Sequence, residues 1–299
     1  MQLATPKPFE GLDAIVTADA PLAPLTWYKI GGPAKYLVRP KSVEQLQEAS
    51  RRCVEHGLPI YVLGHGANVL VNDRGVDGAV FRFDDPFWSN VDVSGDNVKV
   101  GAGADMAKLV VNLARQGLAG FECMAGIPGT IGGGIRMNAG GKYGDIGAIV
   151  SRVTVMDSHG EVFERTKQDL VFEYRRTNIV APFILGATLE LDADDANAIA
   201  HRTKEIWMYK RNTQPLNTKN CGCVFKNPRG ISAGALIDQA GLKGLRVGGA
   251  EVSAKHANFV VAHPGATADD VLKLIKVIQD RVYDKHQTVL ESEVKIWPV

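Results

Sequence analysis

The segment AGIPGTIGGGIRMNAGG, residues 125–141, is richer in glycine than any other stretch of the sequence. Pro128 fixes one turn of the chain. Four further glycines remove side chains over a long surface: Gly129, Gly132, Gly133 and Gly134. Such a surface suits a backbone that packs closely against a flat or diphosphate-bearing ligand. A tight multi-turn connection without a ligand would use the same residues, so this segment alone leaves both interpretations open.

A second glycine loop, GHGAN at residues 64–68, follows the apolar residues 60–63, which we expect to form a buried strand. Its two glycines match the start of a dinucleotide fingerprint, but the third glycine is replaced by Val69 and no helix signal follows. A Rossmann domain is therefore disfavoured. The glycines still let backbone N–H groups approach an anion, and Asn68 can donate beside them. Two such loops favour ligand binding over a plain connection.

The composition excludes several classes of protein. With 45% hydrophobic and 22% charged residues, the chain of 299 residues is typical of a globular protein with two or three structural units. The formal net charge of +1 is dispersed, so we expect no nucleic-acid partner. We expect neither a signal peptide nor membrane insertion, because no apolar run approaches the roughly 18 residues that span a bilayer. Four cysteines do not make a disulfide framework, which favours a reducing cytoplasm.

The hydrophobic pattern predicts a mixture of helices and strands. Helices are expected at residues 42–56, 105–116, 233–240 and 267–286. Two of them begin with the signature of a capping box, Ser42 with Gln45 and Thr267 with Asp270. Strands are expected at residues 60–63, 150–156, 161–166 and 183–191, the middle two as a hairpin. From about residue 191 the sequence becomes polar and helical, which indicates a domain boundary near residue 190.

The segment NCGCVFKNP, residues 220–228, places two thiols beside a lysine and an asparagine. A zinc site is disfavoured, because Cys221 and Cys223 have the spacing CxC and no second Cys or His pair follows. A redox dithiol usually reads CxxC at the start of a helix, whereas a strand or turn is expected here. For Cys221 we expect a buried structural role. For Cys223 the polar neighbours favour a role in chemistry.

The sequence resembles the family of UDP-N-acetylenolpyruvoylglucosamine reductases (the MurB family). The resemblance lies in TWYKIGG (26–32), LGHGANVL (63–70), GIPGTIGG (126–133), MNAG (137–140), YRRT (174–177), KRNTQP (210–215), GCVFKNP (222–228) and VSAKH (252–256). These motifs run in order from about residue 22 to Glu293, which is far more specific than any one of them. The short interval between Tyr174 and Tyr209 leaves little room for the extra substrate loop of longer family members, so the chain resembles the shorter subgroup.

The resemblance implies an α+β flavoprotein. An FAD-binding domain would span residues 1–190, as two subdomains of about 1–80 and 81–190, of the type shared with vanillyl-alcohol-oxidase-like flavoenzymes. A C-terminal α+β substrate domain would span residues 191–299, and its last residues would return to the active site. FAD would be bound non-covalently, with NADPH as co-substrate.

The implied reaction is the reduction of UDP-N-acetylglucosamine enolpyruvate to UDP-N-acetylmuramate in peptidoglycan synthesis. The resemblance thus implies a UDP-sugar as the partner, and a cytoplasmic enzyme that acts as a monomer. Such a reduction needs a source of hydride, stabilisation of the negative charge that develops on the substrate carboxylate, and a proton donor.

By resemblance, three residues are catalytic: Arg175, Cys223 and Glu293. The guanidinium of Arg175 can grip the substrate carboxylate as a fork. Cys223 stands where the family has serine, or in some members cysteine, as proton donor, and a thiol with a reference pKa of about 8.5 is a far stronger acid than a hydroxyl. Glu293 matches the C-terminal catalytic glutamate, but Glu291 would share its face in a strand, so the register is open. Thr177 stands where the family usually has serine.

The resemblance also assigns two sets of binding residues. The cofactor-binding set is Gly64, Gly66, Ala67, Asn68, Gly126, Pro128, Gly129, Gly132, Gly133, Asn138 and Gly140. The substrate-binding set, suited to a nucleotide diphosphate and sugar amides, is Lys210, Arg211, Gln214 and Asn227. No metal site is expected.

Two other functions remain open on the sequence alone. Another flavin-dependent oxidase or dehydrogenase on the same scaffold would explain the glycine loops, but not GCVFKNP or Glu293. A flavin- or nucleotide-binding module without catalysis would not need three residues whose chemistry matches one reaction.

Overall fold

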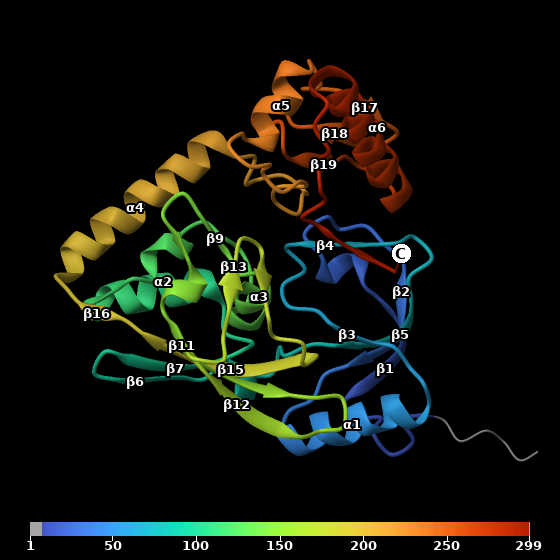
Figure 1. Ribbon diagram of the computed structural model, residues 1–299. Coiled ribbons are helices and arrows are strands. Elements are labelled where there is room, and N and C mark those ends of the chain that lie inside the picture. The colour runs from blue at the N-terminus through green and yellow to red at the C-terminus, as the bar shows by residue number, and fades with distance from the viewer. Residues whose placement is uncertain (1–7, 299) are drawn as a thin grey trace, which may run out of the picture. The chain divides into compact units, whose positions relative to one another are not determined.

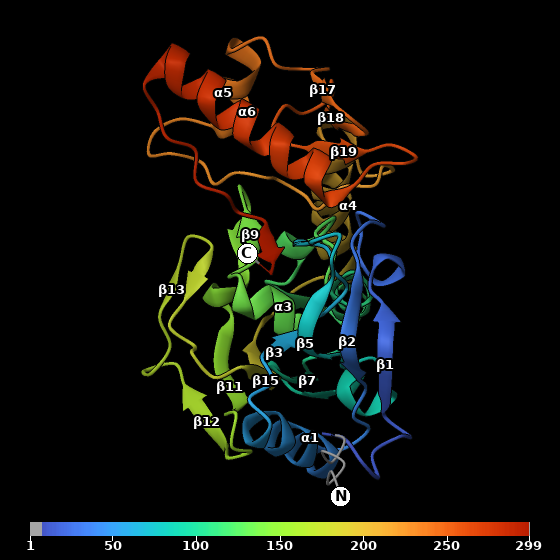
Figure 2. The same ribbon diagram turned by 90° about the vertical axis from the view of Figure 1, so that its right-hand side faces the viewer.

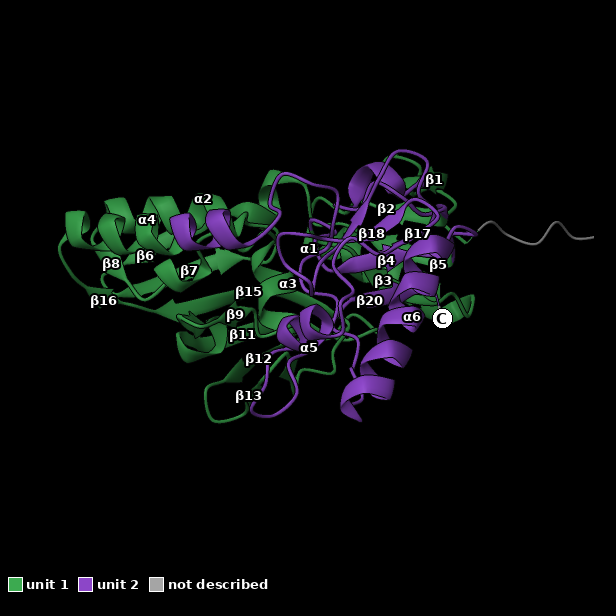
Figure 3. Ribbon diagram, turned by 90° about the horizontal axis from the view of Figure 1, so that it is seen from above, with its two compact units in different colours: residues 1–20, 34–64, 77–206 green, residues 21–33, 65–76, 207–299 purple. Residues whose placement is uncertain are grey.

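The computed structural model describes residues 8–298, which divide into two compact units (Figure 3). Unit 1 comprises residues 34–64 and 77–206 together with the chain up to residue 20. Unit 2 comprises residues 21–33 and 65–76 together with the chain from residue 207. Each unit has its own cluster of buried apolar residues. The mixture of helices and mostly antiparallel strands confirms the predicted α+β class.

The first sheet has four strands in the order β1-β2-β5-β3, which lie side by side in Figure 2. The strands are β1 Val16–Pro21, β2 Pro33–Val38, β3 Ile60–Val62 and β5 Val76–Phe81. β3 and β5 pair in parallel, with Ile60 opposite Ala79. β3 ends at Val62, two residues before the first glycine of the GHGAN loop, so the sheet sets where that loop begins.

Helix α1, Val43–Glu55, buries Leu46, Ala49 and Cys53 in the core of unit 1. Its N-cap is Ser42, whose hydroxyl accepts from the backbone N–H of Gln45 at 3.3 Å, as predicted. The predicted capping box is wrong in one detail. Gln45 Oε1 accepts from the N–H of Lys41 at 2.8 Å and so caps one residue earlier than Ser42.

An antiparallel five-stranded sheet of unit 1 has the order β12-β11-β15-β7-β6 (Figure 1). The strands are β6 Val91–Ser94, β7 Asn97–Gly101, β11 Val150–Met156, β12 Val162–Thr166 and β15 Phe183–Glu190. The predicted hairpin is confirmed: β11 pairs with β12, with Arg152 opposite Thr166. The turn is fixed by Asp157, whose carboxylate accepts from the N–H of His159 at 2.9 Å.

The remaining elements of unit 1 are short, apart from α2. Helix α2, Met106–Arg115, is capped by Asp105, and α3, Ile131–Arg136, is capped by Thr130. The short strands are β8 Leu118–Ala119, β9 Gly140–Gly141, β10 Gly144–Asp145, β13 Phe172–Glu173, β14 Arg176–Thr177 and β16 Asp192–Ala193. The 3-10 helices are η2 Pro86–Ser89, η3 Glu122–Met124 and η4 Ile146–Ala148. Helix α4, Ala196–Thr213, begins in unit 1 and ends in unit 2.

The described part of unit 2 contains a three-stranded sheet, a two-stranded parallel pair, one 3-10 helix and, besides the end of α4, two α-helices. The three strands are β17 Arg246–Val247, β18 Ala250–Val252 and β19 Val260–Ala262. The parallel pair is β4 Val69–Val71 with β20 Lys295–Trp297. The helices are η1 Ala23–Leu25, α5 Ala233–Gln239 and α6 Ala268–His286. The capping box of Thr267 and Asp270 is complete, and the apolar residues Val271, Leu274, Ile275, Ile278 and Val282 of α6 are buried.

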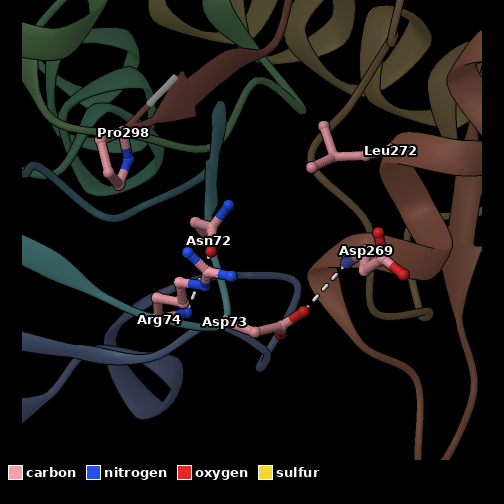
Figure 4. Close-up of a pocket in the computed structure, with 6 residues that line it drawn as sticks. All are labelled: Asn72, Asp73, Arg74, Asp269, Leu272 and Pro298. Atoms are coloured by element: carbon pink, nitrogen blue, oxygen red, sulfur yellow. Dashed lines mark hydrogen bonds between the residues drawn. The ribbon is translucent and has the colours of Figure 1, made fainter.

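A hollow of about 500 Å³ in unit 2 lies beside the first turn of α6 (Figure 4). It is lined by Asn72, Asp73, Arg74, Asp269, Leu272 and Pro298. Here the Asp73 carboxylate accepts from the backbone N–H groups of Ala268 and Asp269, at 2.8 Å and 3.0 Å. A carboxylate at a helix N-terminus satisfies donors that the helix itself leaves unpaired. Asp73 therefore fastens residues 65–76 to α6.

We expect Asp73→Ala to lower the free energy of unfolding by about 1 kcal/mol, the usual cost of a lost cap. The control is Asp280→Ala, which removes an exposed ion pair with Lys276 near the other end of α6 and should cost less than about 0.5 kcal/mol. Urea unfolding followed by circular dichroism measures both. Equal losses in the two variants would contradict the capping role of Asp73.

Candidate functional site

Cys223 and Glu293 lie on adjacent segments of unit 2. Cys223 forms an isolated antiparallel bridge with Phe259. The next residue, Val224, accepts from the backbone N–H of Glu293 at 2.7 Å. The thiol of Cys223 is half-buried and Glu293 is 9% exposed. The two residues of this unit that were predicted to be catalytic are therefore brought together by backbone hydrogen bonds.

The structure settles which glutamate of LESEV points inward. Glu293 is buried, whereas the side chain of Glu291 is 71% exposed and forms an ion pair with Lys226. The backbone of residues 291–294 is not a regular strand, so residues two apart do not share a face. Because Lys226 is paired with a carboxylate, its charge is partly compensated before any ligand arrives.

The loop after β3 is joined to the end of the chain through Asn68. The side-chain amide of Asn68 donates to the backbone carbonyl of Glu293 at 3.3 Å. The backbone carbonyl of Asn68 accepts from the N–H of Lys295 at 3.1 Å. The parallel pairing of β4 with β20 continues this contact. Asn68, predicted as a cofactor ligand, thus also holds the segment that carries Glu293.

Cys221 has the buried structural position predicted for it. It is 2% exposed, and burial raises the pKa of its thiol to about 12. Burial likewise raises the pKa of Cys53, in α1, to about 12. Both thiols therefore stay protonated at neutral pH and are poor nucleophiles. Cys123 is buried as well, and its Sγ donates to the carbonyl of Gly120 at 3.2 Å.

We expect iodoacetamide at about pH 8 to alkylate Cys223 well before the other three cysteines, because only thiolates react and the other thiols are buried. Peptide mass mapping at increasing times of exposure measures the order of modification. Modification of Cys221 as fast as that of Cys223 would contradict this assignment of exposure.

The four predicted substrate-binding residues all lie in unit 2. Lys210 is 8% exposed near the end of α4, and its carbonyl accepts from the N–H of Gln214 at 2.8 Å. The guanidinium of Arg211 lies 5.1 Å from the ring centre of Trp207. Asn227 Oδ1 accepts from the N–H of Ala233 at 3.0 Å, which places its amide at the start of α5. Their contacts with a substrate remain a prediction.

Arg175 lies in unit 1, at the tip of the hairpin β13–β14. Its φ of +58° is in the left-handed region, which costs a residue with a Cβ about 1–2 kcal/mol. Its guanidinium donates to the carbonyl of Gly140 at 2.9 Å and lies 5.1 Å from the ring centre of Tyr174. A strained, half-buried arginine held on its own hairpin is the kind of residue that functional sites retain.

Asn138 is hydrogen-bonded to that hairpin at Glu173, directly before its tip. It is 3% exposed, and its amide donates to the carbonyl of Glu173 at 3.0 Å while accepting from the N–H of Gly147 at 3.0 Å. The sequence resemblance assigned Asn138 to the cofactor. The structure adds that its side chain also positions the hairpin that carries Arg175.

Three glycines of segment 126–134 serve close packing: a Cβ on Gly129 or Gly134 would meet the side chain of Met106 at 3.1 Å or 2.7 Å, and one on Gly132 would meet that of Ala102 at 3.0 Å. The segment is also braced by residues 102–104, where the N–H of Gly132 donates to the carbonyl of Ala102 at 2.9 Å. Gly133 is exposed, and a Cβ built there would meet only the hydroxyl of Thr130, at 3.5 Å. A backbone that is braced by this packing and open at Gly133 allows the close approach of a flat or diphosphate-bearing ligand.

Comparisons with known proteins agree with this geometry. Residues 34–166, which include both glycine loops, match the family model of an FAD-binding domain. Residues 214–297 match that of the C-terminal domain of UDP-N-acetylenolpyruvoylglucosamine reductase. The chain is therefore an α+β flavoprotein whose C-terminal part matches the reductase domain, and the open backbone at Gly133 fits the close approach of FAD.

Similarity extends over nearly the whole chain. A UDP-N-acetylenolpyruvoylglucosamine reductase of Symbiobacterium thermophilum is 41% identical, over 93% of this chain and 90% of that protein. One of Desulfosudis oleivorans is also 41% identical, over 93% of each chain. The crystal structure of the reductase from Thermus caldophilus has a TM-score of 0.82 at 37% identity and covers 95% of this chain and 98% of that chain. The chain belongs to the UDP-N-acetylenolpyruvoylglucosamine reductase family, which confirms the resemblance.

Residues 8–298 contain neither a membrane-spanning helix nor a metal-binding cluster. No helix there is long and apolar enough to cross a membrane. No group of three or more His, Cys, Asp or Glu side chains is placed to hold a metal ion.

Proposed function

We propose that the protein reduces UDP-N-acetylglucosamine enolpyruvate to UDP-N-acetylmuramate, with FAD as cofactor and NADPH as reductant. The observation that carries this proposal is identity of about 40% with such reductases over more than nine-tenths of the chain. The half-buried Cys223 supports it, because the reaction needs a proton donor held in a fixed place, and the segment of Cys223 is hydrogen-bonded through Val224 to the buried Glu293.

FAD, when bound by the glycine loops, would supply the hydride transfer that no side chain can provide. The residues of the chain then have three tasks. Arg175 binds the substrate carboxylate and stabilises the negative charge that develops on it. Cys223 delivers a proton from Sγ to the α-carbon. Glu293 places a second ionisable group beside the Cys223 segment, where it can exchange a proton with the reacting centre.

Binding of the UDP-sugar falls to the residues at the end of α4 and the start of α5. Lys210 and Arg211 supply positive charge for the diphosphate, while the amides of Gln214 and Asn227 suit the polar groups of the sugar. The glycines of residues 64–68 and 126–140 hold FAD without a covalent link. We further propose that the protein acts as a monomer in the cytoplasm, in the synthesis of peptidoglycan, and that its FAD-binding domain divides into two subdomains near residue 80.

The direct test is NADPH consumption under nitrogen, with and without UDP-N-acetylglucosamine enolpyruvate. We expect consumption only with the substrate, and a product that mass spectrometry finds heavier by two hydrogens. NADPH consumption that needs oxygen, yields hydrogen peroxide and leaves the substrate unchanged would instead favour an oxidase.

A further inference from the structure

Asn258 makes an unusual set of hydrogen bonds in unit 2. Its side-chain amide donates to the carbonyl of Phe225 at 2.8 Å and accepts from the N–H of the same residue at 2.9 Å. Its backbone carbonyl accepts from the N–H of Val224 at 2.8 Å. Its own N–H donates to His256 Nδ1 at 3.3 Å. Asn258 is 2% exposed, so these bonds form away from water.

The amide of Asn258 takes the place of a peptide group in a strand pair. A primary amide presents one acceptor and a donor in the arrangement that a neighbouring strand would offer. No regular ladder runs here, because the pairing of Cys223 with Phe259 is an isolated bridge. The side chain therefore supplies the contact that a longer ladder would otherwise provide. Without it, the buried N–H and carbonyl of Phe225 would both lose their partner.

Phe225 is the point from which both catalytic segments are held. It lies two residues after Cys223, and on its other side it forms an isolated bridge with Ser292, the residue before Glu293. Between them, Val224 accepts from the N–H of Glu293. We call the two hydrogen bonds between the Asn258 side chain and the backbone of Phe225 the Asn258 clamp. Through Phe225, this clamp fixes the spacing between the Cys223 segment and the Glu293 segment.

Asn258 is itself held in place by contacts of His256, two residues before it, and of neighbouring residues. Burial lowers the pKa of His256, so its ring is neutral at neutral pH and Nδ1 can accept from the N–H of Asn258. The ring packs edge to face against Phe259, with centres 4.9 Å apart. The loop of residues 256–259 is therefore ordered before any ligand binds.

We propose that Asn258 is a positioning residue that sets the Cys223 thiol and the Glu293 carboxyl group in register for proton delivery. The inference rests on the proposed roles of Cys223 and Glu293. Asn258 itself touches neither substrate nor cofactor in this account. It acts through Phe225, and its removal should affect the substrate-reducing step without affecting the reduction of flavin by NADPH.

Two variants test the clamp. Asn258→Ala removes both side-chain bonds to Phe225. Asn258→Asp keeps the shape, but an ionised carboxylate has no donor for the Phe225 carbonyl. A protonated carboxyl group has one donor and one acceptor again, so this variant should recover as the pH falls. The control is Val282→Ala in the buried face of α6, which weakens the same core without touching these bonds.

Two readouts are needed. Hydrogen exchange followed by mass spectrometry reports the amides of Phe225 and Glu293. Stopped-flow absorbance reports flavin reduction by NADPH and, separately, flavin reoxidation by the enolpyruvyl substrate.

We expect both Asn258 variants to speed exchange at these amides and to slow reoxidation about 10²-fold, with flavin reduction unchanged. The rate of flavin reoxidation in Asn258→Asp, divided by the wild-type rate at the same pH, should rise as the pH is lowered from about 8 to about 6. Reoxidation at the wild-type rate, or a loss no greater than in Val282→Ala, would overturn the inference. Cys223→Ala, measured in parallel, separates the two proposals. If the flavin of Cys223→Ala is reoxidised at the wild-type rate, the proposed role of Cys223 is wrong. The inference about Asn258 then fails as well, even if faster hydrogen exchange at Phe225 in the Asn258 variants shows that the two side-chain bonds exist.

Discussion

Cys223→Ala is expected to slow reoxidation of the reduced flavin by UDP-N-acetylglucosamine enolpyruvate by about 10³-fold, within the usual range for loss of a general acid. Alanine has no proton to give. Reduction of the flavin by NADPH should proceed at the wild-type rate, because that step needs no proton from this thiol. Stopped-flow measurement of the two steps separates these effects.

Two further cysteine variants act as controls for this prediction. Cys223→Ser should stay active, since its hydroxyl keeps a proton donor at the same place, and it should resist alkylation. Cys221→Ala should react at the wild-type rate, because Cys221 is a buried thiol with a raised pKa of about 12. Wild-type reoxidation in Cys223→Ala would remove Cys223 from the chemistry.

Arg175→Ala is expected to lower kcat for substrate reduction by about 10²- to 10³-fold, the range for loss of a group that stabilises developing charge. Arg175→Lys should recover only part of the rate, since an ammonium cannot grip a carboxylate with two parallel hydrogen bonds. Steady-state kinetics with the UDP-sugar measures both. The control is Arg176→Ala. The exposed guanidinium of Arg176 lies 4.0 Å from the carboxylate of Glu173, and its removal should leave the rate of substrate reduction unchanged.

The backbone at Arg175 allows activity and stability to be separated. Glycine adopts a φ of +58° without the penalty that arginine has there. Arg175→Gly should therefore abolish most of the activity while it changes the free energy of unfolding by less than about 1 kcal/mol, because relief of the left-handed strain is offset by the greater backbone freedom that glycine loses on folding. A greater loss of stability in Arg175→Gly would show that the guanidinium bond to Gly140 matters more to the hairpin than the strain.

The helices could be predicted because their signals are local. Ser42, Asp105 and Thr267 each accept from an N–H three residues on, and such caps depend only on nearby residues. The same holds for the β11–β12 hairpin and its Asp157 turn. The family motifs added the candidate chemistry of Cys223, which no spacing rule for thiols would have given.

What the sequence left open depends on contacts between distant residues. Glu293 is buried, whereas Glu291 forms an ion pair with Lys226, which lies 65 positions away in the chain. The clamp at Asn258 joins residues separated by 33 positions, so nothing near the VSAKH motif indicates it. The placement of residues 21–33 and 65–76 with the C-terminal part likewise rests on long-range contacts, such as that of Lys295 with Asn68.

The proposed reaction can be followed directly in the purified protein without oxygen. NADPH is added until the flavin absorbance is bleached, and UDP-N-acetylglucosamine enolpyruvate is then added while the spectrum is followed. Rapid return of the oxidised spectrum, with formation of UDP-N-acetylmuramate, is the predicted result. A flavin that stays bleached until oxygen is admitted would contradict the proposed reaction.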